Sequence, residues 1–183
     1  MEVLSAGIKK SAPWVMPGLL CLIVTSACAQ PIDEYQVKAA FLYNFAKFVE
    51  WPEHSFKSSL DPIRICVLGR NPFGDYLGNA IKGRDILGRP LQTADVSDVR
   101  QASGCHMVFV GASERTRFKT MAAELNGASV LTVGETQGFT SGGGVVNFKL
   151  EDGRIRFEIN LQAADHAKLR ISSKLLNLAR IVK

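Results

Sequence analysis

The feature that most restricts the fold of this chain is a change in its hydrophobic pattern. Three short runs, residues 63–68, 106–110 and 130–133, are apolar at most positions, which is typical of strands buried on both faces of a parallel sheet. Later, residues 145–150 and 154–159 alternate apolar with polar side chains around an Asp-Gly step, a strong hairpin signal. The order predicts a sheet that is parallel first and antiparallel last.

Helical stretches lie before and between these strands. A long helix is expected over residues 33–50, with Asp33 as its N-cap and Pro52 beyond its end. A second helix should cover residues 72–81, with Asn71 as cap and a proline at its first position. Helices alternating with strands indicate an α/β fold.

The second half of the chain continues this alternation. Residues 91–94 form a short strand candidate, and Ser113 is expected to cap a helix that ends at Leu125. Helices are also predicted over about residues 163–169 and 172–182. The predicted fold class is α/β: a three-layer, mostly parallel sheet flanked by helices, with a C-terminal antiparallel hairpin and terminal helices.

Residues 1–29 have the pattern of a cleavable signal peptide. Lys9 and Lys10 precede an apolar stretch at residues 14–24, and Ala27-Cys28-Ala29 fits the small-x-small site of signal peptidase. Cleavage near Ala29 would leave residues 30–183, a length suited to a single domain.

Two alternatives to cleavage remain open. The apolar stretch could be an uncleaved membrane helix, although it is shorter than the roughly 20 residues that span a bilayer and contains Pro17 and Gly18. Cys28 could instead carry the lipid of a lipoprotein. The aliphatic residue usual three positions before such a cysteine is replaced by Thr25.

Charge and motifs disfavour nucleic-acid binding and catalysis. The net charge is +5, and no run of five basic residues or basic stripe with interleaved aromatics occurs. The histidines, His54, His106 and His166, have no partner at metal-ligand spacing. No nucleophile elbow or phosphate loop is found. The sequence therefore predicts a binding protein and not an enzyme, with no metal or cofactor.

Two cysteines, Cys66 and Cys105, lie outside the leader. In an oxidising compartment such a pair is a candidate disulfide, whereas in the cytosol two buried thiols would be more common. Each cysteine lies in or beside a predicted strand, so neighbouring strands would bring the two Cα atoms within bonding range. Two buried thiols remain the alternative.

The first predicted helix is apolar around much of its circumference. Val37, Phe41, Phe45 and Phe48 form one stripe, and Tyr35, Leu42 and Val49 form another. A surface helix normally has one apolar face. Either the C-terminal helix covers the second stripe, or an exposed patch meets a partner or a second copy of the chain, with Tyr43 and Trp51 at its rim.

A small-molecule site is the alternative function. In doubly wound sheets, ligands bind at the carboxyl ends of the parallel strands. Arg70, Asn71, Ser113 and Arg115 follow two such strands, and Ser113 and Arg115 at a helix start could hold an anion. Helix capping is the simpler role for Ser113.

Several segments together resemble the YfiR family of periplasmic proteins. Six segments in order carry the resemblance: residues 37–52, 65–69, 104–111, 130–133, 156–160 and 169–176. The resemblance implies a periplasmic protein that represses a membrane-anchored, YfiN-like diguanylate cyclase by binding its periplasmic sensor domain, which lowers cyclic di-GMP and biofilm formation. Some members are joined to sensor kinases, so a kinase is the alternative partner, and a homodimer is also possible.

The resemblance also bears on the cysteines. The characterised member of the family carries two disulfides, and Cys66 and Cys105 match one of these pairs. No cysteines remain in this chain for the second, near the glycine-rich hairpin. Redox control through a second bridge is therefore not expected here.

Overall fold

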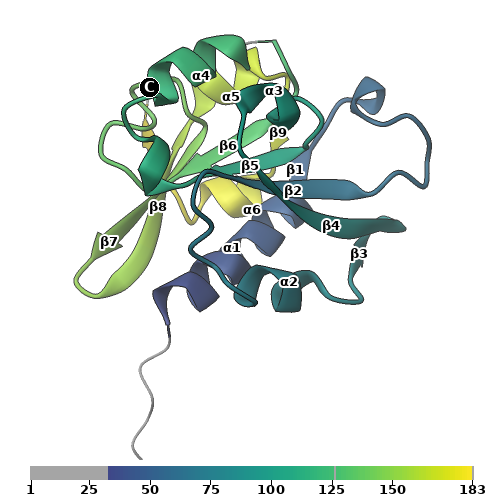
Figure 1. Ribbon diagram of the computed structural model, residues 1–183, viewed down its shortest axis with the longest axis horizontal. Coiled ribbons are helices and arrows are strands. Elements are labelled where there is room, and N and C mark those ends of the chain that lie inside the picture. The colour runs from purple at the N-terminus through teal and green to yellow at the C-terminus, as the bar shows by residue number, and fades with distance from the viewer. Residues whose placement is uncertain (1–32, 126, 183) are drawn as a thin grey trace, which may run out of the picture. The chain divides into compact units, whose positions relative to one another are not determined.

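The computed structural model describes residues 33–125 and 127–182, so the predictions for the leader and for Cys28 lie outside the described residues. Within that part of the chain, eight strands form one sheet in the order β10-β8-β7-β6-β5-β2-β4-β3 (Figure 1). Their bounds are β2 (Ile63–Leu68), β3 (Asp85–Ile86), β4 (Arg89–Val96), β5 (Met107–Val110), β6 (Leu131–Gly134), β7 (Val146–Glu151), β8 (Arg154–Asn160) and β10 (Arg180–Val182). A separate antiparallel pair joins β1 (Val49–Glu50) to β9 (Arg170–Ile171).

The pairing within the large sheet confirms the predicted fold class. Strands β4, β2, β5, β6 and β7 are mutually parallel, and β7 and β8 form the antiparallel hairpin. The chain leaves β2 toward β4 on one side and returns to β5 on the other. The carboxyl ends of β2 and β5 therefore flank a topological switch point.

Short helices connect and cover these strands. They are α1 (Glu34–Phe48), α2 (Tyr76–Ile81), α3 (Val99–Ala102), α4 (Phe118–Glu124), α5 (Leu161–His166) and α6 (Ser173–Leu176), with the 3-10 turns η1 (Glu53–Ser55) and η2 (Ala112–Glu114). None of the helices in the described ranges is long and apolar enough to cross a membrane.

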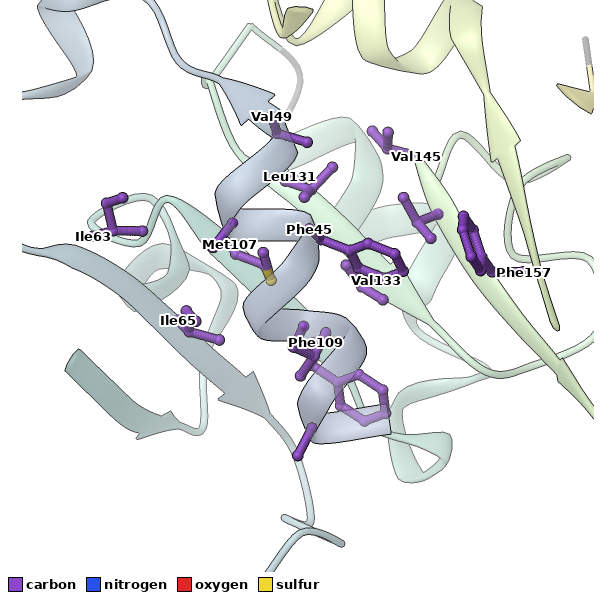
Figure 2. Close-up of a cluster of buried hydrophobic side chains, with 14 of the residues drawn as sticks. Phe45, Val49, Ile63, Ile65, Met107, Phe109, Leu131, Val133, Val145 and Phe157 are labelled. Carbon is purple, nitrogen blue, oxygen red and sulfur yellow. The ribbon is translucent and has the colours of Figure 1, made fainter. Parts of the chain in front are cut away.

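Side chains of the central strands alternate between two cores, one on each face of the sheet. Ile65 and Val67 of β2 point into the core under α1 and α2, whereas Cys66 and Leu68 point into the core under α3 and α4. Figure 2 shows the first core, where Phe45 of α1 lies among residues of β5, β6 and β8. The sheet is therefore the middle of three layers.

Helix α1 begins as predicted and ends earlier. The Asp33 carboxylate accepts a hydrogen bond from the Tyr35 backbone N–H at 2.8 Å, so Asp33 is the N-cap. The predicted end at Glu50 was wrong, because β1 starts at Val49 and pairs with β9. The Phe48 carbonyl already accepts the N–H of Ser172.

A buried ion pair joins α1 to the segment after β6. The Lys38 ammonium lies 2.6 Å from a carboxylate oxygen of Glu135 and also contacts Glu34. Burial works to lower the pKa of Lys38, but the hydrogen bonds and charges of Glu135 and Glu34 outweigh it, and the pKa is raised. The pair stays ionised and fixes the start of α1 against the sheet.

Two predicted helix starts were wrong. Asn71 accepts a hydrogen bond from the Phe73 backbone N–H, but helix α2 begins only at Tyr76, because Gly74 has a φ of +51° and cannot lie within a helix. Ser113 does not cap a helix either. It lies within η2, and α4 begins at Phe118.

The C-terminal helix predicted over residues 172–182 was also wrong. Ser172 does cap a helix, but α6 ends at Leu176 and the chain continues as β10. Strand β10 runs parallel to β8, with Ile181 opposite Ile159. Pairing with the otherwise open edge of β8 replaces helical hydrogen bonds with sheet hydrogen bonds.

Candidate interaction site

The largest groove on the described part of the chain lies at the amino ends of β2 and β4. It has a volume of about 890 Å³. Its walls come from α1, the segment of residues 51–59 and the β3–β4 turn. The apolar and aromatic side chains among its lining residues are Tyr43, Ala46, Val49, Trp51, Phe56, Ile63, Ile86 and Leu87.

The segment of residues 51–62, which we call the wall segment, is held by side chains far from it in sequence. The Trp51 indole N–H donates to the His106 carbonyl at 2.9 Å. The Arg89 guanidinium donates to the carbonyls of Ser58 at 2.7 Å and Asp61 at 3.1 Å, and lies 3.8 Å from the centre of the Phe56 ring. These contacts give the groove a defined wall.

His106 is the buried anchor of this wall. Its Nδ1 accepts the Arg64 backbone N–H at 3.1 Å, and its Nε2 lies 3.1 Å from the Ser55 carbonyl. Because a carbonyl can only accept, Nε2 carries the proton and the ring is neutral. Burial lowers the pKa of His106, and the nearby charges of Arg64 and Arg89 lower it further, although the hydrogen bond to Ser55 opposes them.

Leu87 forms the exposed lip of the groove. It occupies the β3–β4 turn with Gly88, and both residues have positive φ, 53° and 79°. Two-residue hairpin turns of this kind favour Asn or Gly. A leucine side chain there is strained and is 96% exposed. Strain and exposure at one apolar residue point to a contact made outside the folded chain.

Two of the predicted partner-binding residues pack inside the molecule. Phe45 is fully buried and stacks on Phe148 with ring centres 5.6 Å apart. Phe41 is partly buried and meets Phe157 edge-on at 5.5 Å. Their stripe is covered mainly by the β7–β8 hairpin. Sequence periodicity identified the apolar face but not the element that covers it.

The remaining three lie at or near the groove. Tyr43 and Trp51 line it, and Phe48 is half-buried at the end of α1. The guanidinium of Arg84 lies 4.5 Å from the centre of the Tyr43 ring. The sequence reasoning did not identify Phe56, Leu87 or Arg89. A leucine followed by glycine at a hairpin turn was the available signal for Leu87.

The predicted small-molecule residues lie elsewhere, at the carboxyl ends of β2 and β5. Arg70, Asn71, Ser113 and Arg115 are all exposed. The Ser113 hydroxyl accepts the Arg70 backbone N–H at 3.0 Å. A Cβ added at Gly69 would lie only 2.4 Å from that hydroxyl oxygen. Ser113 thus fills the switch point instead of leaving it open.

Only Asn71 of this set lines a cavity. That cavity has a volume of about 390 Å³ and includes Asp75 and Asp95 in its lining. The Asn71 amide donates to the Asp95 carboxylate at 2.8 Å. Two carboxylates beside Asn71 disfavour an anion there.

The predicted disulfide is confirmed. Cys66 and Cys105 are bonded, with Cα atoms 6.0 Å apart. The bridge joins β2 to the residue before His106, so it lies beneath the anchor of the wall segment. No group of three His, Cys, Asp or Glu side chains that could hold a metal is found among the described residues.

A doubly wound sheet with an apolar groove at its amino edge defines an α/β domain of the binding type. The sequence matches the YfiR/HmsC-like family (DUF4154) over residues 35–180. The chain belongs to this family, which is regulatory rather than catalytic.

Solved structures resemble the chain in fold. A conserved domain protein from Vibrio cholerae gives a TM-score of 0.56 at 12% identity, covering 82% of this chain and 60% of that one. The ABC domain in complex with L-Trp from Streptococcus pneumonia gives a TM-score of 0.47 at 12% identity, covering 65% and 55%. The chain spans less than two thirds of each. No curated protein matches it.

Proposed function

We propose that this chain is a periplasmic regulator that represses a membrane-anchored diguanylate cyclase of the YfiN kind by binding its periplasmic sensor domain. Repression would lower cyclic di-GMP and biofilm formation. Family membership over residues 35–180 is the observation that carries the proposal. A sensor kinase is the alternative partner within the same role.

The location in the periplasm is supported by two features. The leader pattern of residues 1–29 predicts export with cleavage near Ala29. The bond between Cys66 and Cys105 fits an oxidising compartment. Lipid attachment at Cys28 would keep the same compartment and add an anchor.

The groove is the surface that we assign to the partner. It brings Trp51 and Phe56 together with the exposed Leu87. Aromatic anchors within an apolar surface are typical of the energetic centre of a protein interface. The charged side chains of Lys47, Glu50 and Arg89 also line it, as expected of a polar rim. A small-molecule role is less well supported, because the switch point is filled by Ser113.

Capture of the partner tests the proposal. The chain, expressed with its own leader, is crosslinked in cells, and the membrane proteins it retains are identified by mass spectrometry. A diguanylate cyclase with a periplasmic sensor domain should be retained, and Leu87→Asp should reduce its yield several-fold. Recovery of soluble proteins alone would contradict a membrane partner.

A further inference from the structure

We propose that His106 is a pH-sensitive latch for the groove. Neutral His106 holds the wall segment in place, and protonation releases it and reshapes the groove. The effect on partner binding rests on the proposed function. The latch itself is a property of the chain alone and can be measured without the partner.

The latch depends on two hydrogen bonds of opposite sense. His106 accepts from the Arg64 backbone N–H of β2 and donates to the Ser55 carbonyl of the wall segment. Only the neutral ring can do both. A proton added at Nδ1 would point at the Arg64 N–H across 3.1 Å, so an attractive contact would become a repulsive one between two donors.

The charges around His106 are mostly positive. Arg64 comes from β2 and Arg89 from β4, and both act against the protonated ring. In the wall segment, Asp61 is the carboxylate that opposes them. His54 and Lys57 line a cavity of about 430 Å³ together with His106. A new positive charge on His106 therefore meets net repulsion, and movement of the wall segment relieves it.

The ring is coupled directly to the groove. Phe56, which lines the groove, stacks on the His106 ring with centres 4.4 Å apart and planes inclined by 18°. The Arg89 guanidinium also contacts the Phe56 ring. Trp51 reaches the backbone of the same residue through its indole N–H. Displacement of His106 therefore changes the position of two aromatic side chains that line the groove.

The indole of Trp51 gives a direct readout. The chain has two tryptophans, Trp14 and Trp51, so full-length protein carrying Trp14→Phe has one indole N–H signal in a proton–nitrogen NMR spectrum. We expect this signal and the His106 ring signals to titrate together, with a midpoint below the ordinary histidine value of about 6.5. Far-UV circular dichroism should stay constant across the same range.

Two variants separate the latch from other effects. His106→Asn keeps an acceptor near the Nδ1 position and cannot be protonated, so the Trp51 signal should no longer titrate. His54→Gln removes a histidine of the same segment and should leave the titration intact. If His106→Asn does not fold, the wild-type His106 ring signals, followed together with Trp51, still decide the matter.

A Trp51 signal that stays constant while His106 titrates would overturn the latch, and so would a titration that persists in His106→Asn. With the captured partner in hand, binding should weaken about tenfold between pH 7.5 and 5.5, and this change should vanish in His106→Asn. If no partner binds at any pH while Trp51 titrates, the proposed function fails and the latch stands.

Discussion

At the scale of single residues, position in the fold decides which apolar side chains are free to act. Phe45 and Leu87 are both large and apolar, yet one is fully buried and the other is 96% exposed. Composition cannot separate them. Local turn chemistry could have drawn attention to Leu87, because leucine is unfavourable where both turn residues have positive φ.

The turn predicts an unusual outcome for Leu87→Asn. Asparagine adopts positive φ more readily than leucine, and almost no buried surface is lost. The free energy of unfolding should stay equal or rise by about 1 kcal/mol, while partner binding weakens. Urea unfolding and the crosslinking assay measure the two effects separately. A clear loss of stability would show that the Leu87 side chain packs within the fold.

The disulfide was predictable because Cys66 and Cys105 lie in or beside predicted strands. Replacing both with alanine should lower the free energy of unfolding by about 3 to 4 kcal/mol, since the bond closes a loop between residues 39 positions apart. Urea unfolding checks this value, with reductant added to the wild type as a second route to the same loss. No change in either case would mean that the bond contributes nothing to stability.

Lys38 makes a prediction about alkaline pH. Its pKa is raised in the folded state by Glu135 and Glu34. The ion pair therefore stabilises the fold fully below the unfolded pKa of about 10.4, and this contribution is lost as pH rises through the folded pKa. Lys38→Met should cost about 3 to 5 kcal/mol near neutral pH because it leaves Glu135 buried without a partner.

The double variant Lys38→Met with Glu135→Leu is the matched control for this pair. It should recover much of the lost stability, because no unpaired buried charge remains. Urea unfolding of the single and double variants at pH 7 gives the comparison. Equal losses in both would show that packing, and not the unpaired charge, carries the effect.

At the scale of helices and strands, the sequence predicted strands better than helix boundaries. Strand pairing produces a hydrophobic period that can be read directly, and β2, β5, β6 and the hairpin lie where expected. Helix ends depend on contacts distant in sequence. Helix α1 stops where β9 pairs with the next two residues, and α6 stops because β8 offers a free edge.

Two leucines of the C-terminal segment test this correction. A single helix over residues 172–182 would place Leu175 and Leu178 on one face. In the structure Leu175 is 2% exposed and Leu178 is 70% exposed. Leu175→Ala should cost about 2 to 5 kcal/mol, and Leu178→Ala less than about 0.5 kcal/mol. Similar losses in urea unfolding would favour the continuous helix.

At the scale of the whole molecule, the two edges of the sheet differ. The carboxyl edge, where doubly wound folds usually bind ligands, is filled by Ser113 against Gly69. The amino edge carries the groove, the wall segment and the His106 anchor. Sequence reasoning named Tyr43 and Trp51 but could not place them beside Phe56 and Leu87, because the groove joins three segments distant in sequence.

Cellular cyclic di-GMP tests the central claim most directly. The gene is deleted and then restored as wild type, as Leu87→Asp, or as Leu178→Asp, which places the same charge on an exposed leucine outside the groove. The account predicts that cyclic di-GMP rises on deletion and returns to its original level with wild type and Leu178→Asp but not with Leu87→Asp, at equal protein levels. Unchanged cyclic di-GMP after deletion would contradict repression of a diguanylate cyclase.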